Sequence, residues 1–221
     1  MIEKRKLGST DLEVARIGIS SSFGAHADVF RAALDRGCNY FTWGTCIKGR
    51  SSAFRDFVRQ LSLEGRRQEL VIGLLSYSHS ALLGEHFLKS ALAQLGTDYL
   101  DGLILGYYSK RPPQRVLDWA AKVKQDGQVR AVGLTTHNRS VVVPLLEEGI
   151  IDYFHIRYNA VHRGAEQDIF AHLGENRPGI VSFTATSWGR LLKQNKMPPG
   201  TQSPSAGDCY RFVLARNEID V

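Results

Sequence analysis

Features that would assign this chain to a membrane or secreted class are absent from its 221 residues. No apolar run approaches the roughly 18 residues that a membrane-spanning helix needs, so no membrane partner is expected. The first ten residues, MIEKRKLGST, lack the apolar core of a signal peptide. The three cysteines, Cys38, Cys46 and Cys209, show neither CxxC spacing nor an even-numbered framework. These absences exclude a disulfide scaffold and predict a reduced, cytoplasmic setting.

Signatures of nucleotide and nucleic-acid binding are also scarce. The sequence has no GxGxxG, and KGRSS, Lys48 to Ser52, lacks the spacing of a Walker motif. Ser51 or Ser52 is better explained as a helix N-cap. The formal net charge is +6, but Lys and Arg are scattered without a run of five, so we expect no nucleic-acid partner. The charge fits a solvated basic surface, or a pocket for a phosphate-bearing cofactor.

What the sequence does contain is a regular alternation of short apolar runs with helix-like segments. The runs are mostly continuous rather than alternating, which is typical of parallel strands covered by helices. The expected strands are Val14–Ile19, Tyr40–Trp43, Leu70–Leu75, Leu100–Leu105, Val129–Thr135, Tyr153–Tyr158 and Ile180–Thr184. The expected helices are Asp28–Arg36, Ser52–Leu63, Leu83–Leu95, Pro113–Gln125, Val141–Glu147, Glu166–Leu173, Trp188–Lys193 and Ala206–Ala215.

This order predicts an α/β fold in one domain, residues 1–221. Seven strand–helix units in succession favour a (β/α)8 TIM-type barrel, and the alternative is an open doubly wound sheet. Residues 1–13 are expected to form an N-terminal β-hairpin, whose strands are Lys4–Leu7 and Leu12–Val14. The closing EIDV only begins an eighth strand, so that strand and the final helix are expected to be missing or incomplete. Truncation of a longer chain, or self-association through the open barrel edge, would account for this.

Six sequence stretches, in order, resemble the aldo-keto reductase family over the whole chain. RKLGSTDLEVARIGI is similar to its opening hairpin and first strand, and ALDRGCNYF to its first helix and second strand. ALAQLGTDYLDGLIL, DGQVRAVGLTTHNR, RYNAVHRGAEQDIF and GIVSFTATSWGRLL are similar to later strand–helix units. The resemblance implies a barrel that binds NADP or NAD at its C-terminal face. It also implies hydride transfer to or from a small carbonyl ligand.

The family's catalytic tetrad is Asp, Tyr, Lys and His, and this sequence departs from it at every position. The position of the family's Asp is occupied by Thr42, that of the Tyr by Ile47, that of the Lys by Leu75 and that of the His by Gly106. A general acid or base typically contributes about 10²–10⁴-fold in rate. An aldo-keto-reductase-like oxidoreductase with weak, altered or lost activity is therefore expected. The alternative is a non-catalytic barrel, a pseudoenzyme that binds a small ligand or regulates another protein.

Two side chains are candidates to replace the missing proton donor. Tyr77 lies two residues beyond Leu75, and His137 lies two beyond Thr135, so each projects in the same direction as that residue. A rim tyrosine and a surface histidine are the plainer interpretations. Cys46 would be a nucleophile only beside a base, and the sequence identifies none.

Other polar residues near strand ends are interpreted structurally. Tyr107, Tyr108 and Lys110 are expected in a structured loop, because Pro112 and Pro113 follow closely. His155 and His162 are seven residues apart, which is not a metal-ligand spacing, so no metal site is expected.

The resemblance also implies residues that would contact the nicotinamide cofactor, and these are better preserved in this sequence than the tetrad. The family's Ser-Asn pair corresponds to Thr135 and Thr136, its Gln to His155 and its stacking aromatic ring to Phe183. Arg190 and a helix start at Gly189 would suit a diphosphate. The predicted cofactor-binding residues are Thr135, Thr136, Asn138, His155, Phe183, Gly189 and Arg190.

Overall fold

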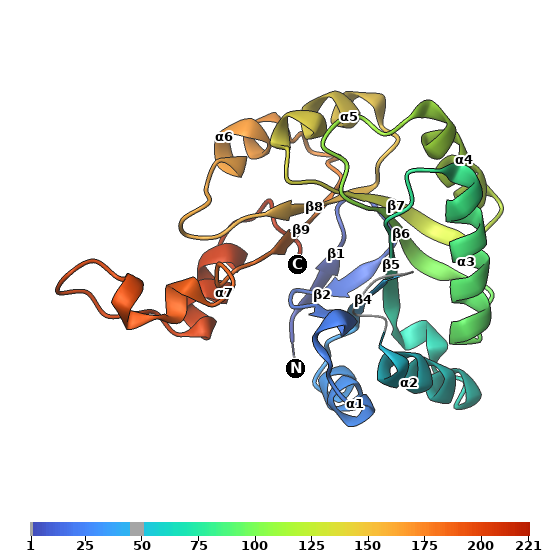
Figure 1. Ribbon diagram of the computed structural model, residues 1–221, viewed down its shortest axis with the longest axis horizontal. Helices are drawn as coiled ribbons and strands as arrows, with labels where there is room; N and C mark the ends of the chain where they lie inside the picture. The colour runs from blue at the N-terminus through green and yellow to red at the C-terminus, as the bar shows by residue number, and fades with distance from the viewer. Residues whose placement is uncertain (1, 45–50) are drawn as a thin grey trace.

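A curled parallel sheet surrounded by helices forms the body of this computed structural model (Figure 1), which describes residues 2–44 and 51–221. The seven strands pair in sequence order, all parallel. They are β3 Ile19–Ser20, β4 Tyr40–Gly44, β5 Val71–Ser76, β6 Leu100–Leu105, β7 Val129–Thr135, β8 Tyr153–Arg157 and β9 Gly179–Phe183. A hairpin of β1 Lys4–Lys6 and β2 Glu13–Ala15 precedes them. The fold is a partial (β/α)8 barrel, as predicted.

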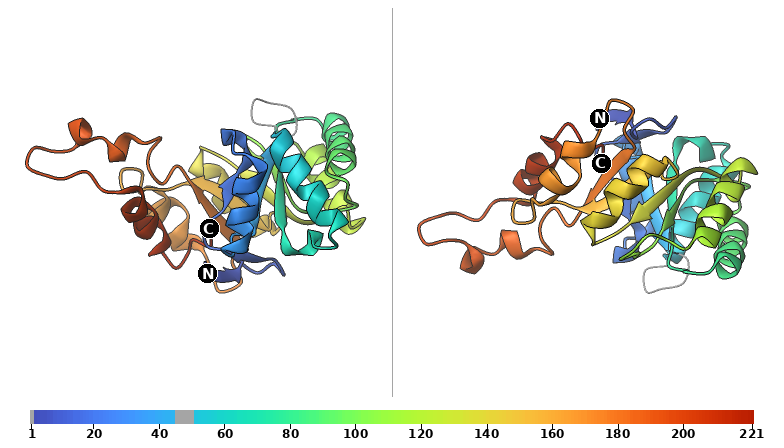
Figure 2. Two further views of the ribbon diagram at one scale, coloured as in Figure 1. Left: turned by 90° about the horizontal axis from the view of Figure 1, so that it is seen from below. Right: turned by 90° about the horizontal axis from the view of Figure 1, so that it is seen from above.

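Helices cover the outside of the sheet. Strand and helix alternate along the chain, and glycines with positive φ end α3 and α5, as expected. The helices are α1 Ala27–Asp35, α2 Ser52–Leu63, α3 Ala81–Leu95, α4 Gln114–Gln125, α5 Val142–Glu148, α6 Ala165–Asp168 and α7 Ala206–Leu214. Ser51 caps α2, because its side chain accepts a hydrogen bond from the Phe54 amide. Between β9 and α7, the chain extends away from the barrel as a long arm (Figures 1 and 2).

Neighbouring residues of β4 pack into two separate hydrophobic cores, one outside and one inside the barrel. Phe41 and Trp43 face outward, where Phe41 packs with Phe30 of α1 and Phe54 of α2 at ring-centroid distances of 6.1 and 5.5 Å. Tyr40, one residue earlier, belongs to the core inside the barrel. The period of two along a strand separates these cores.

Two tyrosines fill the barrel interior because the neighbouring strands carry glycine there. A Cβ added at Gly102 would overlap the Tyr153 hydroxyl, and one at Gly133 would lie 2.5 Å from the same ring. A Cβ at Gly18 would lie 2.6 Å from the ring of Tyr40. The large side chains of Tyr40 on β4 and Tyr153 on β8 thus fit inside the barrel because glycines face them.

Three predicted elements were wrong in their bounds. The first barrel strand is only Ile19–Ser20 rather than Val14–Ile19, because Val14 lies in hairpin strand β2, as the hairpin prediction had it. The expected helix Trp188–Lys193 is a single 3-10 turn, Arg190–Leu192, because Ser187 and Trp188 have φ of 51° and 55°. The expected helix Glu166–Leu173 is divided into α6 and a 3-10 turn, because Ile169 has φ −133° and ψ −58°.

The last residues of the chain begin to pair beside β9. The Ser182 amide donates to the Val221 carbonyl at 2.8 Å, and the Asp220 amide donates to the Ile180 carbonyl at 2.8 Å. Among the helices that the structure describes, none is both long and apolar enough to cross a membrane.

Candidate functional site

The tetrad positions lie at the carboxyl ends of β4, β5 and β6. Thr42 is buried on β4, Leu75 lies on β5, and Gly106 follows β6 directly. Ile47 and Cys46 lie outside the described residues. The described positions carry a hydroxyl, an isobutyl group and a hydrogen, so none of them holds a titratable group.

Position 106 has no room for a side chain. A Cβ there would lie 2.8 Å from the carbonyl oxygen of Ser76 and 2.9 Å from Cδ1 of Tyr77. The Gly106 amide also donates to that carbonyl at 2.8 Å, which holds the two strand ends together. Because Tyr77 occupies the adjoining space, the family's histidine would not fit here without movement of the Tyr77 ring and of the Ser76 backbone.

Aromatic rings line the mouth of the barrel, which we define as the carboxyl ends of its strands. Tyr77 stacks on Tyr107 at 5.2 Å with 14° between the ring planes, and Tyr107 stacks on His137 at 5.6 Å with 23°. The edge of His137 meets Phe183 at 5.4 Å. We call Tyr77, Tyr107, His137 and Phe183 the aromatic row. It joins both candidate proton donors, which sequence reasoning considered separately, and runs from the end of β5 to the end of β9.

Arg157, the last residue of β8, is the charged member of the mouth. Its Nη2 donates to Nδ1 of His137 at 3.0 Å, and its guanidinium lies 4.8 Å from the ring centre of Trp188. Sequence reasoning missed this residue. The signal was present, because residue 157 follows the inward-facing 153 and 155 at the period of two.

The contact with Arg157 fixes the state of His137. Arginine has only donors, so Nδ1 of His137 must accept, and the neutral ring carries its proton on Nε2. Partial burial and the positive charge of Arg157 lower the pKa of His137. A neutral imidazole whose lone pair is engaged is a poor general acid and a poor base, but its Nε2–H can donate to a ligand.

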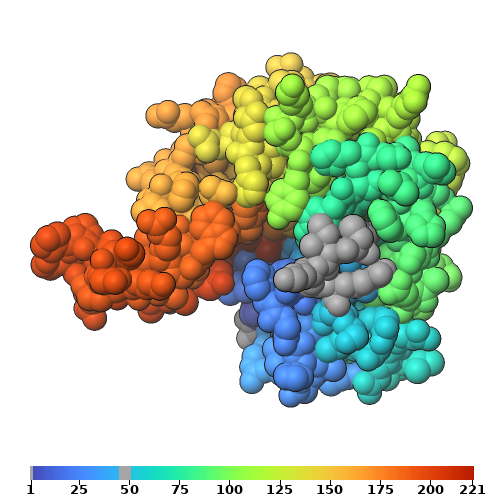
Figure 3. All heavy atoms as spheres, viewed as in Figure 1, coloured from blue at the N-terminus to red at the C-terminus, as the bar shows by residue number. Residues whose placement is uncertain are grey.

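The backbone at the mouth is strained. Tyr107, Thr184, Ser187 and Trp188 have φ between 51° and 63°, and they are the non-glycine residues with positive φ in the described ranges. Such conformations cost about 1–3 kcal/mol each and cluster at functional sites. Two of them present large side chains to solvent, because Tyr107 is 54% exposed and Trp188 is 63% exposed. Figure 3 shows this side of the molecule hollowed near its centre.

His155 lies below the mouth, inside the barrel. Its Nε2 shares a 2.8 Å hydrogen bond with the Tyr40 hydroxyl, and burial lowers the pKa of His155 to about 3. Burial also raises the pKa of the Tyr40 phenol. His155 is therefore neutral, and its Nε2 is bonded within the barrel.

Two of the other predicted cofactor residues build a loop instead of facing an open space. The Thr136 hydroxyl donates to the Tyr108 carbonyl at 2.7 Å. The Asn138 amide donates to the Ser109 carbonyl at 2.9 Å, and its oxygen accepts from Ser140. Tyr108 itself is buried and stacks on His79 at 4.2 Å. The loop after β6 is thus ordered by contacts, as the sequence indicated.

The nicotinamide site that the resemblance implies does not fit these side chains well. Thr136, Asn138 and His155 already use their polar groups in the contacts described. Thr135 is buried at the end of β7, and Phe183 retains a ring face at the end of β9. Arg190 is exposed, but it stands in a 3-10 turn of three residues rather than at the start of a long helix. A diphosphate would therefore meet Arg190 without the amides of a long helix.

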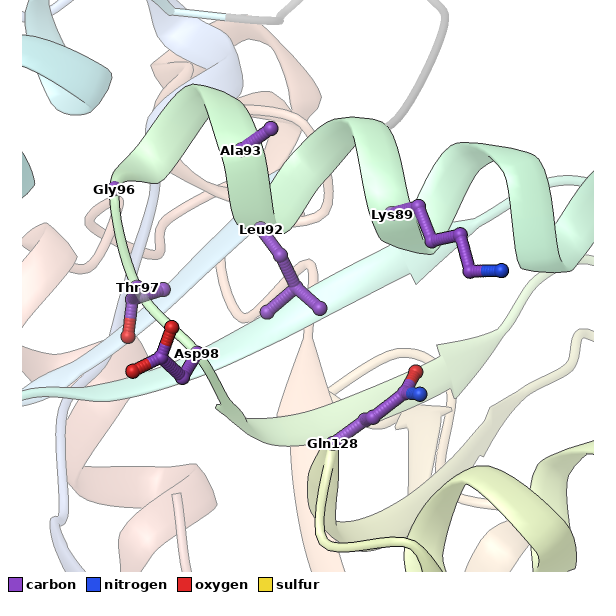
Figure 4. A pocket seen from close by; sticks show the side chains of 7 residues that line it. All are labelled: Lys89, Leu92, Ala93, Gly96, Thr97, Asp98 and Gln128. Atoms are coloured by element: carbon purple, nitrogen blue, oxygen red, sulfur yellow. The ribbon is translucent and has the colours of Figure 1, made fainter.

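Two hollows of the surface lie away from the mouth. One is bounded by the C-terminal end of α3 and the start of β6, with Leu92, Gly96 and Asp98 among its lining residues (Figure 4). The other lies beside the hairpin, between Lys4, Asp35 and Arg130. In the described ranges, no group of three or more His, Cys, Asp or Glu side chains is placed to hold a metal ion.

No protein-family model and no curated protein matches this sequence. Solved structures do match it. Two are the aldo-keto reductase AKR11C1 from Bacillus halodurans in its apo and holo forms, with TM-scores of 0.80 and 0.82. Each is 21% identical, and the match covers 100% of this chain and 84% of the other. The chain therefore has the aldo-keto reductase fold that its sequence predicted.

Proposed function

We propose that this chain binds a small organic ligand at the mouth of an aldo-keto-reductase-type barrel and does not reduce carbonyls through the tetrad. The observation that carries the proposal is the packing at Gly106, where Ser76 and Tyr77 leave no space for a catalytic side chain. Leu75 on the adjoining strand cannot replace the missing charge.

The aromatic row supports binding better than proton transfer. Tyr77 stacks on Tyr107, and His137 is held neutral by its contact with Arg157. Among the described residues that line the mouth, the charged donor facing a developing alkoxide is the Arg157 guanidinium, which does not give up its proton. Exposed rings beside a cation are instead suited to holding a flat, polar molecule.

An assay of NADPH oxidation against a panel of aldehydes tests this proposal. We expect no turnover above the rate without protein. If turnover is found, Tyr77→Phe and His137→Ala identify a substitute donor, with Tyr210→Phe on the exposed face of α7 as the control. Turnover above the rate without protein would contradict the proposal, and a rate that falls at least about tenfold in one variant, but not in the control, would identify that residue as the donor.

The second candidate is an oxidoreductase that still binds a nicotinamide cofactor. Two observations favour it: the fold is shared with a reductase described as a holo form, and Thr135 and Phe183 remain at the mouth. Titration of the folded protein with NADPH and with NADH, followed by the emission of the reduced nucleotide, tests it. Saturable binding of either nucleotide supports this candidate, and the absence of binding removes it.

A further inference from the structure

Arg157 is a partly buried cation for which the described chain supplies no carboxylate partner. Arg67 and Arg177 are also withdrawn from solvent, and each bonds a buried aspartate: Arg67 bonds Asp101 at 3.0 Å, and Arg177 bonds Asp220 at 2.7 Å. Among the described residues, Arg157 contacts the neutral His137 and the ring of Trp188 but no carboxylate. Its Nε is buried and makes no hydrogen bond. A withdrawn charge without a counter-charge is costly, so an anionic ligand would stabilise this site.

The surroundings of Arg157 hold its guanidinium in place. One donor is directed at His137, and the Trp188 ring covers the group at 4.8 Å. Held in this way, the guanidinium loses little freedom when it binds, which favours affinity. Nη1 makes no hydrogen bond within the described ranges, so at least one strong donor remains for an anion.

The walls of the site are flat and apolar. Tyr107 and Trp188 are exposed, and both have backbones in the left-handed region that position their rings at the mouth. His137 stacks on Tyr107, and its Nε2–H is the second available donor. Because Tyr107 already stacks on both Tyr77 and His137, the face left for a planar ring is that of Trp188. A carboxylate on that ring would match the donors of Arg157 and His137.

We propose that the mouth binds a small planar carboxylate, an arene or heteroarene carboxylate, with its anionic group on Arg157 and its ring against the exposed Trp188. The inference rests on the proposed function and names the class of its ligand. A single guanidinium with one additional neutral donor matches a monoanion better than a phosphate, which usually draws several cations or amides.

Calorimetric titration of the full chain tests the inference with four probes: benzoate, benzamide, acetate and inorganic phosphate. Benzoate should bind saturably. Benzamide, which lacks the charge, and acetate, which lacks the ring, should each bind at least about tenfold more weakly, the size of one charge-assisted hydrogen bond or one ring contact. Phosphate binding tighter than benzoate would overturn the assignment of the ligand class.

Variants separate the role of Arg157 from general charge. Arg157→Gln should weaken benzoate binding at least about tenfold, while Arg115→Gln, the same change on the exposed face of α4, should leave it unaltered. Equal affinity in Arg157→Gln and the parent would overturn the inference. If Arg157→Gln does not fold, Trp188→Leu replaces it: the benzoate affinity should fall, and an unchanged affinity would overturn the inference.

The outcomes distinguish this inference from the proposed function. If benzamide binds as tightly as benzoate and Trp188→Leu weakens both, the mouth binds ligands and only the anionic class is wrong. If none of the four probes and neither nicotinamide nucleotide binds to the folded protein, both proposals are wrong.

Discussion

The two ends of this barrel are built in opposite ways. At the end closed by the hairpin, a buried aspartate, Asp220, accepts hydrogen bonds from two backbone amides and from Arg177, and lies 3.7 Å from Arg5. At the mouth, Arg157 has no acidic partner in the described ranges, and the backbone at Trp188 is strained. At the hairpin end the buried carboxylate has its donors within the chain, whereas the mouth leaves donors and rings available.

We expect the two ends of the sheet to have different roles: the hairpin end stabilises the fold, and the mouth binds the proposed ligand. The hairpin end joins the first and last segments of the chain, because the backbone amides of Gly8 and Ile180 both donate to Oδ2 of Asp220. Residues at the mouth make fewer such bonds and carry the exposed aromatic surface. We therefore expect substitutions at the hairpin end to change folding, and substitutions at the mouth to change ligand binding.

The largest effect is expected at Asp220. Asp220→Ala should lower the free energy of unfolding by about 3–5 kcal/mol, because it leaves the partly buried Arg177 and two amides without their acceptor. Urea denaturation measures the change. Asp168→Ala, which removes an exposed ion pair with Arg139, is the control and should cost less than about 1 kcal/mol. Equal losses in the two variants would contradict the division between the ends.

The next largest effect is expected inside the barrel. Gly102→Ala places a methyl group on the Tyr153 hydroxyl and should cost roughly 3 kcal/mol of unfolding free energy. Tyr153→Phe in the same chain removes the overlapping atom and should restore part of that loss. Gly174→Ala has open space around it and serves as the control. A double variant as unstable as Gly102→Ala alone would argue against the overlap as the cause.

A smaller effect should appear on acidification. The pKa of His155 is about 3 in the folded protein and about 6.5 when unfolded, so the unfolded chain takes up the proton first. Its contribution to stability is complete above pH 6.5 and is lost as the pH falls toward 3. Between pH 6.5 and pH 4.5 we expect a loss of roughly 2 kcal/mol. Urea titrations across this range should show a flatter profile for His155→Gln, and identical profiles would contradict the assignment.

The smallest effect on folding is expected at the mouth. Trp188→Gly relieves a positive φ but removes the contact with Arg157, so the two changes nearly cancel. The free energy of unfolding should change by less than about 0.5 kcal/mol in urea denaturation, while benzoate binding weakens. A loss above about 2 kcal/mol would show that the mouth also supports the fold.

Periodicity predicted most of the fold because most barrel strands are short, largely apolar runs that alternate with helices followed by glycine. The bounds of β6 and β7 match the prediction. It was wrong at β3, where Val14 reads as a barrel strand but turns back into the hairpin. It was also wrong after β9, where left-handed residues at Ser187 and Trp188 replace the expected helix. The second departure has no local sequence signal, because neither Ser187 nor Trp188 is glycine.

The sequence predicted the missing tetrad groups and three members of the aromatic row, Tyr77, His137 and Phe183, but not the contacts that join them. The family resemblance, with the register of its flanking motifs, placed Thr42, Leu75 and Gly106 at the tetrad positions. Arg157 was missed because its partners, His137 and Trp188, lie 20 and 31 residues away along the chain, and their meeting depends on strand order. Sequence placed His155 beside a cofactor, but a glycine-lined interior and Tyr40 hold it below the mouth.

The packing of Tyr77 against Gly106 also limits how this chain can change. A histidine at position 106 would clash with the Tyr77 ring. Replacing Tyr77 alone with a smaller residue would remove a member of the aromatic row. Either single step is unfavourable, so placing a histidine at position 106 would need coupled replacements on adjacent strands. The residue types at positions 77 and 106 are therefore expected to change together or not at all.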